Sequence, residues 1–167
     1  MTQIKRVCIV GAGAIGSLYA AHLSTACEVS VLTRREVHAS LLNSEGLRVS
    51  GKSQLQTQMK AAHSPAVLDD ADLVIIATKA NHVQESVETI SGYFPGAIVM
   101  TVQNGLGCEE VVTQYGDWPI LSAVTFMAGT KHSDVHVEYE LDTATWIGPW
   151  VGSHASYANA QSVAALI

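Results

Sequence analysis

The sequence predicts an α/β fold in which a mostly parallel, doubly wound sheet carries helices on both faces. Short apolar segments alternate along the chain with segments of helical periodicity, the order that a parallel sheet with crossover helices requires. A glycine-rich turn, residues 11–16, lies between the first apolar segment and the first helical one. No internal repeat or linker divides the 167 residues, so we expect one domain spanning residues 1–167.

The expected strands of this sheet are runs of apolar residues, as is typical of strands that are buried on both faces. They span residues 6–10, 28–33, 72–78, 97–102 and 120–126. Helices are expected between them because apolar side chains recur at helical spacing. The five expected helices end near Ala26, Asn43, Gly92, Tyr115 and Ile167.

Two further strand pairs are expected outside the parallel set. Residues 46–50 and 54–59 alternate across a turn at Gly51-Lys52, which predicts a hairpin. Residues 135–141 and 143–147 also alternate and are separated by Asp142 alone. We therefore expect the second pair to form an antiparallel hairpin at the edge of the sheet.

The composition argues against several classes of protein. Nine Lys and Arg against fifteen Asp and Glu give a net charge of −6 without any basic run, which disfavours a nucleic-acid partner. No apolar run approaches the roughly 20 residues that span a bilayer, so no membrane association is expected. Three widely spaced cysteines and a start without a secretory pattern predict a cytoplasmic protein with reduced thiols.

The glycine-rich turn predicts a dinucleotide-binding site of the Rossmann type. Gly11 permits the tight turn, Gly13 lets a pyrophosphate approach the backbone, and Gly16 lets helix and strand pack closely. The amides and the positive end of the helix dipole would hold the anion. The alternative is a glycine-rich turn that binds no ligand. The strand before the turn and the helix after it make this alternative less favoured.

The end of the second expected strand predicts which dinucleotide is bound. A site specific for NAD places Asp or Glu there to bond the ribose 2′-hydroxyl. Here the strand ends in Leu32-Thr33-Arg34-Arg35, without a carboxylate. Because a guanidinium suits the 2′-phosphate of NADP, we expect NADP (NADPH), with Arg34 as the principal ligand and Arg35 as a helper. Two solvated surface arginines are the alternative.

Two more polar segments follow expected strands, at the edge where open α/β sheets bind ligands. Lys79 could reach a cofactor ribose or a substrate carboxylate, and an ordinary solvated lysine is the alternative. Asn104, in Gln103-Asn104-Gly105-Leu106-Gly107, offers both donor and acceptor groups. Asn-Gly is also a common turn sequence, so that alternative stays open as well.

Other residues with reactive side chains predict no site. His132 and His136 are expected on one face of a strand region, but no third ligand is near them, so we expect no metal. Cys108 precedes an expected helix, where the pKa of a thiol can fall. No His or Asn is placed to make it a nucleophile.

Taken together, these motifs resemble the N-terminal half of the ketopantoate reductase (2-dehydropantoate 2-reductase) family. The resemblance rests on residues 11–16, Leu32-Thr33-Arg34, residues 77–80 and residues 103–107, and on Ile147-Gly148-Pro149 near the end. It implies NADPH-dependent reduction of the keto acid ketopantoate to pantoate, on the route to pantothenate and coenzyme A. The alternatives are a dinucleotide-binding regulatory module and a related dehydrogenase with another hydroxy-acid substrate.

The resemblance also implies which residues contact the cofactor. Arg34 would hold the 2′-phosphate, and Lys79 and Asn104 would lie near the reactive end, with Asn104 close to the substrate. Gly129 would make another cofactor contact. The pyrophosphate would be held by Gly11, Ala12, Gly13, Ala14, Ile15 and Gly16.

Members of this family are longer and carry a second, helical domain that supplies the general-acid lysine and most substrate contacts. We therefore expect the general acid to lie beyond residue 167 and the chain to be an N-terminal fragment of a two-domain enzyme. The apolar residues Val163, Leu166 and Ile167 at its end favour the same interpretation. They also predict an exposed docking face through which the fragment associates with itself.

Overall fold

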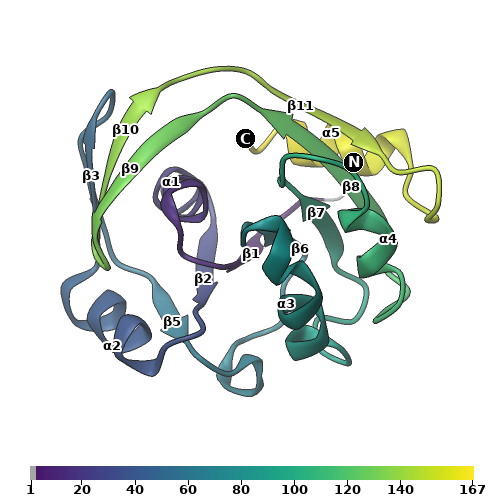
Figure 1. Cartoon of the computed structure of the whole chain (residues 1–167), viewed down its shortest axis with the longest axis horizontal. Coiled ribbons are helices and arrows are strands. Elements are labelled where there is room, and N and C mark those ends of the chain that lie inside the picture. The colour runs from purple at the N-terminus through teal and green to yellow at the C-terminus, as the bar shows by residue number, and fades with distance from the viewer. Residues whose placement is uncertain (1–2) are drawn as a thin grey trace.

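The computed structural model describes residues 3–167 and contains two sheets (Figure 1). The larger has seven strands in the order β11-β8-β7-β6-β1-β2-β5. Neighbouring strands are parallel except at one edge, where β11 runs antiparallel to β8, so the predicted mostly parallel sheet is confirmed. The strands are β1 (Arg6–Val10), β2 (Glu28–Leu32), β5 (Lys60–Ala62), β6 (Leu73–Ile76), β7 (Ile98–Thr101), β8 (Ile120–Thr125) and β11 (Thr145–Pro149).

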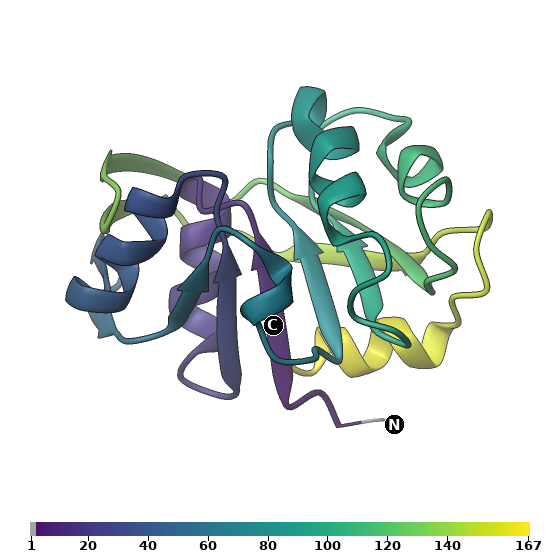
Figure 2. The same cartoon turned by 90° about the horizontal axis from the view of Figure 1, so that it is seen from below.

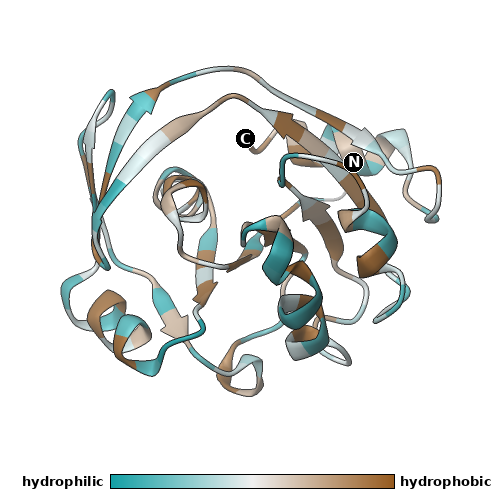
Figure 3. Cartoon of the chain, in the orientation of Figure 1, coloured by the Kyte–Doolittle hydropathy of each residue, from teal (hydrophilic) through white to brown (hydrophobic). Residues whose placement is uncertain are grey.

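Helices pack on both faces of this sheet, as the alternating sequence pattern predicts. α1 (Ala14–Leu23) and α5 (Tyr157–Ala164) contribute to one apolar core, and α3 (Val83–Ile90) and α4 (Cys108–Val112) contribute to the other. α2 (Glu36–Glu45) lies against β5, and strands β1, β2, β5 and β6 run side by side (Figure 2). Apolar residues gather on the strands between the two helical layers (Figure 3).

The second sheet was not predicted. Its four strands are ordered β4 (Leu55–Thr57), β3 (Leu47–Gly51), β10 (His136–Leu141) and β9 (Ala128–Ser133). The antiparallel β3–β4 pair confirms the hairpin expected across Gly51-Lys52. Because α1 contacts strands of both sheets, it lies between them (Figure 1). Leu47, Val49 and Val137 of the smaller sheet are buried in the same core as α1.

The hairpin expected from residues 135–141 and 143–147 is wrong. Both segments are strands, but β10 pairs with β9 and β3, whereas β11 pairs with β8 in the other sheet. Apolar alternation indicates a strand without specifying its partner. The sequence of β9, Ala-Gly-Thr-Lys-His-Ser, shows no such alternation, so the true neighbour of β10 was not recognised.

The end of the chain also differs from the expectation of an exposed apolar face. Ser156 caps α5 in a capping box, and Val163 is fully buried. Leu166 packs against the same core, so Ile167 is the only one of the three that is exposed. Self-association of the chain stays a prediction. No helix within residues 3–167 is long and apolar enough to cross a membrane.

Candidate functional site

A cleft of about 540 Å³ opens at the carboxyl edge of the seven-stranded sheet. Its walls come from the segments that follow β1, β2, β5 and β6. The chain passes from β1 to β2 on one side and places β6 on the other side of β1, so the strand order changes direction here. Open α/β sheets bind ligands in the crevice at such a point.

The glycine-rich turn forms the floor of this cleft. Gly11 has a φ of +98°, a conformation that favours glycine, and its amide donates to the Leu32 carbonyl at 2.9 Å. A side chain at Gly16 would overlap the carbonyl oxygen of Gly11. Gly11 is therefore required by the backbone of the turn, and Gly16 by the close approach of α1 to the end of β1, whether or not a ligand is bound.

Gly13 differs from the other two because it is exposed and its position tolerates a side chain. An added Cβ would meet no atom within 4 Å. Gly13 is the N-cap of α1, and no side chain caps this helix end. The amides of the first turn consequently have no intrahelical acceptor and no capping oxygen. Open space beside such amides fits a pyrophosphate group.

The two predicted arginines follow β2 at the adjacent wall. Arg34 is exposed and has no hydrogen-bond or ion-pair partner among residues 3–167. Arg35 donates through Nη2 to Oδ1 of Asp134 at 2.6 Å. The Thr33 hydroxyl donates to the Arg35 carbonyl at 2.9 Å, which fixes the turn that carries both arginines.

The smaller sheet supplies a wall of the cleft that sequence reasoning missed. Lys131 of β9 donates through Nζ to the Ala12 carbonyl at 2.9 Å and pairs with Oδ1 of Asp134 at 3.2 Å. The buried His38 of α2 donates through Nε2 to the Asp134 carbonyl at 2.8 Å. Lys131 and Ala12 are 119 positions apart, and no local pattern marks either residue as a partner of the other.

The charges in the cleft are predominantly positive, although the chain is acidic. Four of its nine Lys and Arg residues line the cleft, against Glu85 as the only acidic lining residue in the described part of the chain. The four are Arg34, Arg35, Lys79 and Lys131. Such a concentration of positive charge favours an anionic ligand.

The pKa values of His38 and Asp134, which lie beside Lys131, are both lowered. Burial and the nearby Lys131 ammonium lower the pKa of His38 below its usual 6.5, so the imidazole is neutral at pH 7. Desolvation raises the pKa of Asp134. The hydrogen bonds from Arg35 and Lys131 outweigh that effect and hold the pKa below 3.8. The carboxylate is therefore ionised at pH 7.

The predicted residues after β6 and β7 lie in neighbouring depressions. Lys79 lines the cleft, whereas Asn104 lines a pocket of about 310 Å³ beside it. Gln103 joins the two, because its Nε2 donates to the carbonyls of Ile76 at 2.6 Å and Thr78 at 2.9 Å. Asn104 is therefore adjacent to the cleft rather than inside it.

The remaining predicted residues do not line the cleft. Ala14, Ile15 and Gly16 form the first turn of α1, where only their backbone amides can face an anion. Gly129 lies on β9, where an added Cβ would come within 2.7 Å of the Glu138 carbonyl oxygen in β10 and 3.0 Å of Leu18 in α1. Close packing of β9 against β10 and α1 thus accounts for this glycine. Its contact with the cofactor stays a prediction.

The two histidines considered as metal ligands lie on neighbouring strands, not on one strand face. Their rings are 5.0 Å apart, but His132 pairs with Glu138 and His136 with Ser50. Within residues 3–167 there is no group of three His, Cys, Asp or Glu side chains arranged to hold a metal.

The cysteines are free thiols. Burial, together with Glu109 and Glu110, raises the pKa of the Cys108 thiol, opposite to the fall that a helix start can cause. Burial also raises the pKa of Cys8, to about 12. Both thiols are therefore protonated, weak nucleophiles at pH 7.

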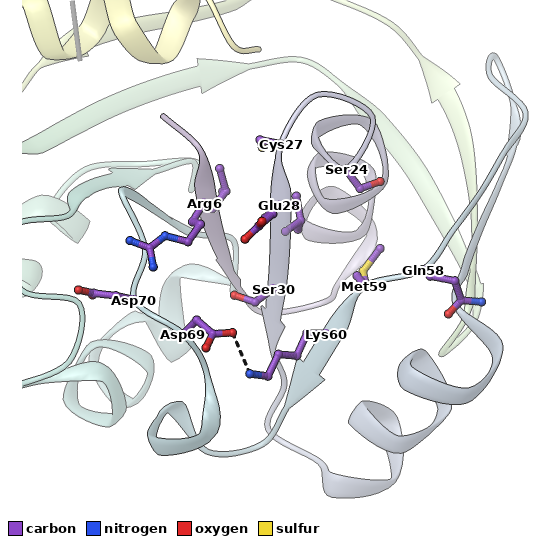
Figure 4. Close-up of a pocket in the computed structure, with 12 residues that line it drawn as sticks. Arg6, Ser24, Cys27, Glu28, Ser30, Gln58, Met59, Lys60, Asp69 and Asp70 are labelled. Carbon is purple, nitrogen blue, oxygen red and sulfur yellow. Dashed lines mark hydrogen bonds and ion pairs between the residues drawn. The ribbon is translucent and has the colours of Figure 1, made fainter. Parts of the chain in front are cut away.

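A third pocket, of about 320 Å³, lies at the opposite, amino edge of the sheet (Figure 4). Arg6 and Glu28, at the starts of β1 and β2, line it together with Lys60 and Asp69. Lys60 and Asp69 pair with each other at 2.9 Å, and both are largely exposed. No glycine lines this pocket, so it has no counterpart of the glycine-rich floor across the sheet.

The chain is similar in sequence to known proteins. The sequence profile of the ketopantoate reductase PanE/ApbA family matches residues 7–152. A 2-dehydropantoate 2-reductase of Pyrococcus horikoshii is 33% identical over 144 residues, which cover 86% of this chain and 47% of that protein.

Two solved structures share the fold. The 2-dehydropantoate 2-reductase of Geobacter metallireducens has a TM-score of 0.84 at 28% identity, over 96% of this chain and 54% of that one. A D-mandelate dehydrogenase, solved as a ternary structure with NADH and anilino(oxo)acetate, has a TM-score of 0.83 at 19% identity, over 96% and 53%.

The chain spans about half the length of these relatives. The family match includes the glycine-rich turn, both arginines, Lys79 and Asn104. It also includes the segment of the smaller sheet that carries Lys131 and Asp134. The family predicted from the sequence is thus confirmed, and the chain belongs to the ketopantoate reductase (PanE/ApbA) family.

Proposed function

We propose that this chain is the NADPH-binding part of a reductase that converts 2-dehydropantoate to pantoate in the cytoplasm, on the route to pantothenate. One observation carries the cofactor assignment: the unpaired guanidinium of Arg34 stands at the end of β2, beside the glycine-rich turn. The names of the relatives support the reaction, since they are 2-dehydropantoate 2-reductases.

The preference for NADPH follows from the charges at the end of β2. A site for NADH needs a carboxylate there to accept the ribose 2′-hydroxyl. The nearest carboxylate along the chain, Glu36, begins α2 and does not line the cleft. A 2′-phosphate would instead meet Arg34 and the outer face of Arg35, which can bind it through charge-assisted hydrogen bonds.

The chain's own residues bind and orient the cofactor, and bound NADPH supplies the hydride for the reduction. The first-turn amides of α1 hold the pyrophosphate, and Arg34 fixes the adenosine end. Lys79 and Asn104 flank the reactive end, with Gln103 holding their two strand ends together. We assign the proton donor to a lysine outside residues 1–167, as the family resemblance implies.

The cofactor assignment is tested by titrating the chain with NADPH and with NADH. We expect NADPH to bind more tightly, and Arg34→Ala to remove most of the difference, about tenfold or more for a charge-assisted hydrogen bond. Arg48→Ala is the matched control, because Arg48 is an exposed arginine of the smaller sheet outside the cleft. An affinity ratio that Arg34→Ala leaves unchanged contradicts the assignment.

The substrate is tested separately, by following NADPH oxidation with 2-oxo acids and the complete gene product. We expect 2-dehydropantoate to be the best substrate and the 167-residue chain alone to turn over negligibly. A second candidate is reduction of another 2-oxo acid. If NADPH is oxidised faster with a phenyl-substituted oxo acid than with 2-dehydropantoate, the substrate assignment is wrong, whereas the cofactor assignment is unaffected.

A further inference from the structure

We infer that Lys131 is a specificity-determining residue, whose ammonium is a third basic ligand, with Arg34 and Arg35, for the 2′-phosphate of the dinucleotide. The inference rests on the proposed function, because it assumes that a 2′-phosphate enters this cleft. The observations that carry it are the hydrogen bonds of Lys131, its position between two loops, and its exposure to the cleft.

The hydrogen bonds of Lys131 leave one donor unused. An ammonium has three N–H donors. One reaches the Ala12 carbonyl at 2.9 Å, and the ammonium also forms an ion pair with Oδ1 of Asp134 at 3.2 Å, which occupies at most one more donor. Nε2 of His38 lies 3.5 Å from Nζ of Lys131. Because the Asp134 carbonyl can only accept a hydrogen bond, Nε2 must carry a proton and donate it to that carbonyl. His38 therefore cannot accept the third proton of Lys131.

The position of Lys131 matches the place where a 2′-phosphate would lie. Ala12, its first partner, stands between the two glycines of the pyrophosphate loop, Gly11 and Gly13. Asp134, its second partner, also binds Arg35 at the end of β2. The ammonium thus lies between the loop after β1 and the arginine segment after β2. Its side chain is 26% exposed and lines the cleft.

Asp134 positions the two cations that it binds. Asp134 lies in the turn between β9 and β10, and its Oδ1 accepts a hydrogen bond from Arg35 and forms an ion pair with Lys131. This turn holds both side chains at one wall of the cleft through contacts within the chain. Pre-ordered cations lose less conformational freedom when an anion binds, which raises affinity for that anion.

The test compares Lys131→Met with Lys60→Met in the 167-residue chain. Methionine keeps most of the apolar stem and removes the charge. Lys60 is a lysine at the opposite edge of the sheet, paired with Asp69 (Figure 4). We expect Lys131→Met to weaken NADPH binding about tenfold and NADH binding by less than about threefold, measured from nucleotide fluorescence. Lys60→Met should change neither affinity, and Lys131→Arg should keep most of the preference.

A purely structural role for Lys131 predicts a different result. If Lys131 only ties the two sheets together, Lys131→Met will lower the melting temperature and weaken NADPH and NADH equally, which overturns the inference. A preference that Arg34→Ala removes and Lys131→Met leaves intact overturns it as well, while the proposed function stands. If neither variant alters the ratio, the proposed NADPH preference itself fails.

Discussion

The two edges of the seven-stranded sheet both carry a pocket with charged walls, and they use the charges in different ways. Four basic residues and one acidic residue line the cleft at the carboxyl edge. The pocket at the amino edge has two basic residues, Arg6 and Lys60, against Glu28, Asp69 and Asp70 (Figure 4). The first pocket is suited to an anion, and the second has no such excess of positive charge.

The bonds made by these charges differ as well. At the amino edge Lys60 pairs with Asp69, and the carboxylate of Asp72, which lies outside the pocket, accepts hydrogen bonds from the amides of Lys5 and Arg6. At the carboxyl edge, Arg34 has no partner within residues 3–167, and Lys131 keeps an unused donor. Charged groups that are already paired stabilise the fold, whereas unpaired ones remain available to a ligand.

The cause lies in the direction of the chain. In a parallel α/β sheet each helix starts after a strand, so helix N-termini gather at the carboxyl edge and their amides add positive potential there. α1 follows β1 in this way, and α2 follows β2. Chain direction, rather than pocket size, therefore distinguishes the edge proposed to bind the cofactor from the opposite edge.

Gly13→Asp is expected to have the largest effect on nucleotide affinity, because it places a carboxylate at the carboxyl edge of the sheet. The new carboxylate would cap α1 by accepting first-turn amides, adding about 0.5 kcal/mol to the free energy of unfolding. It would also occupy and repel the pyrophosphate, so NADPH and NADH affinity should both fall at least about 100-fold. Thermal unfolding and nucleotide titration measure the two changes.

A matched carboxylate at the other edge controls for charge alone. Gln58→Glu adds one at the exposed rim of the amino-edge pocket and should leave both nucleotide affinities unchanged. The comparison fails if Gly13→Asp melts higher yet still binds NADPH normally, because the amides of α1 would then not hold the pyrophosphate.

A smaller effect, on stability alone, is expected from Asp72→Ala. This change removes the acceptor of the Lys5 and Arg6 amides, at 2.8 and 2.9 Å, which fix the start of β1. Because water can replace the carboxylate at these exposed amides, the loss should be about 1–2 kcal/mol in urea unfolding. Nucleotide affinity of the folded protein should not change.

Asp70→Ala is the control for this second change. Asp70 lies two positions from Asp72 and lines the amino-edge pocket, and within residues 3–167 its carboxylate accepts only the amide of the next residue, Ala71, at 3.2 Å. Its loss should leave stability nearly unaltered. A drop in NADPH affinity in Asp72→Ala would show that the amino edge also takes part in binding and would break the comparison.

Local signals explain what the sequence could predict. The strand, glycine-rich turn and helix over residues 6–23 are contiguous, and Arg34 directly follows a strand, so neighbouring residues identify both. The parallel sheet follows from repeated units of the same kind. Asn104 was expected near the cofactor, and it lies beside the cleft because β7 neighbours β6 in the sheet.

The smaller sheet shows what local signals cannot provide. β3 of the hairpin at residues 47–57 pairs in parallel with β10, almost 90 residues later in the chain. That pairing brings Lys131 and Asp134 to the cleft, yet β9 has no apolar alternation to mark it as a strand. The smaller sheet packs on the face of α1 that the larger sheet does not cover. The periodicity of a single segment does not show which strands will pair on that face.

The smallest effect concerns the pH dependence of stability at the carboxyl edge. Unfolded His38 binds a proton near pH 6.5, whereas the folded residue, with its lowered pKa, binds it only at lower pH. Between these values the unfolded state holds more protons, so the free energy of unfolding must fall as the pH drops from 7 toward 5. His38→Gln removes this contribution and keeps a side-chain N–H for the Asp134 carbonyl.

We therefore expect the loss of stability between pH 7 and pH 5 to be smaller in His38→Gln than in the unmodified chain, as measured by urea unfolding at each pH. The pH range stays above the usual pKa of 3.8 for aspartate, so Asp134 remains ionised throughout. His154→Gln, which alters an exposed histidine away from the cleft, should retain the full loss. If His38→Gln instead loses as much as the unmodified chain, then His38 takes up its proton as readily folded as unfolded. The imidazole beside the Lys131 ammonium would then not be kept neutral by the fold. The conclusion that His38 donates to the Asp134 carbonyl and leaves a proton of Lys131 free would have to be revised.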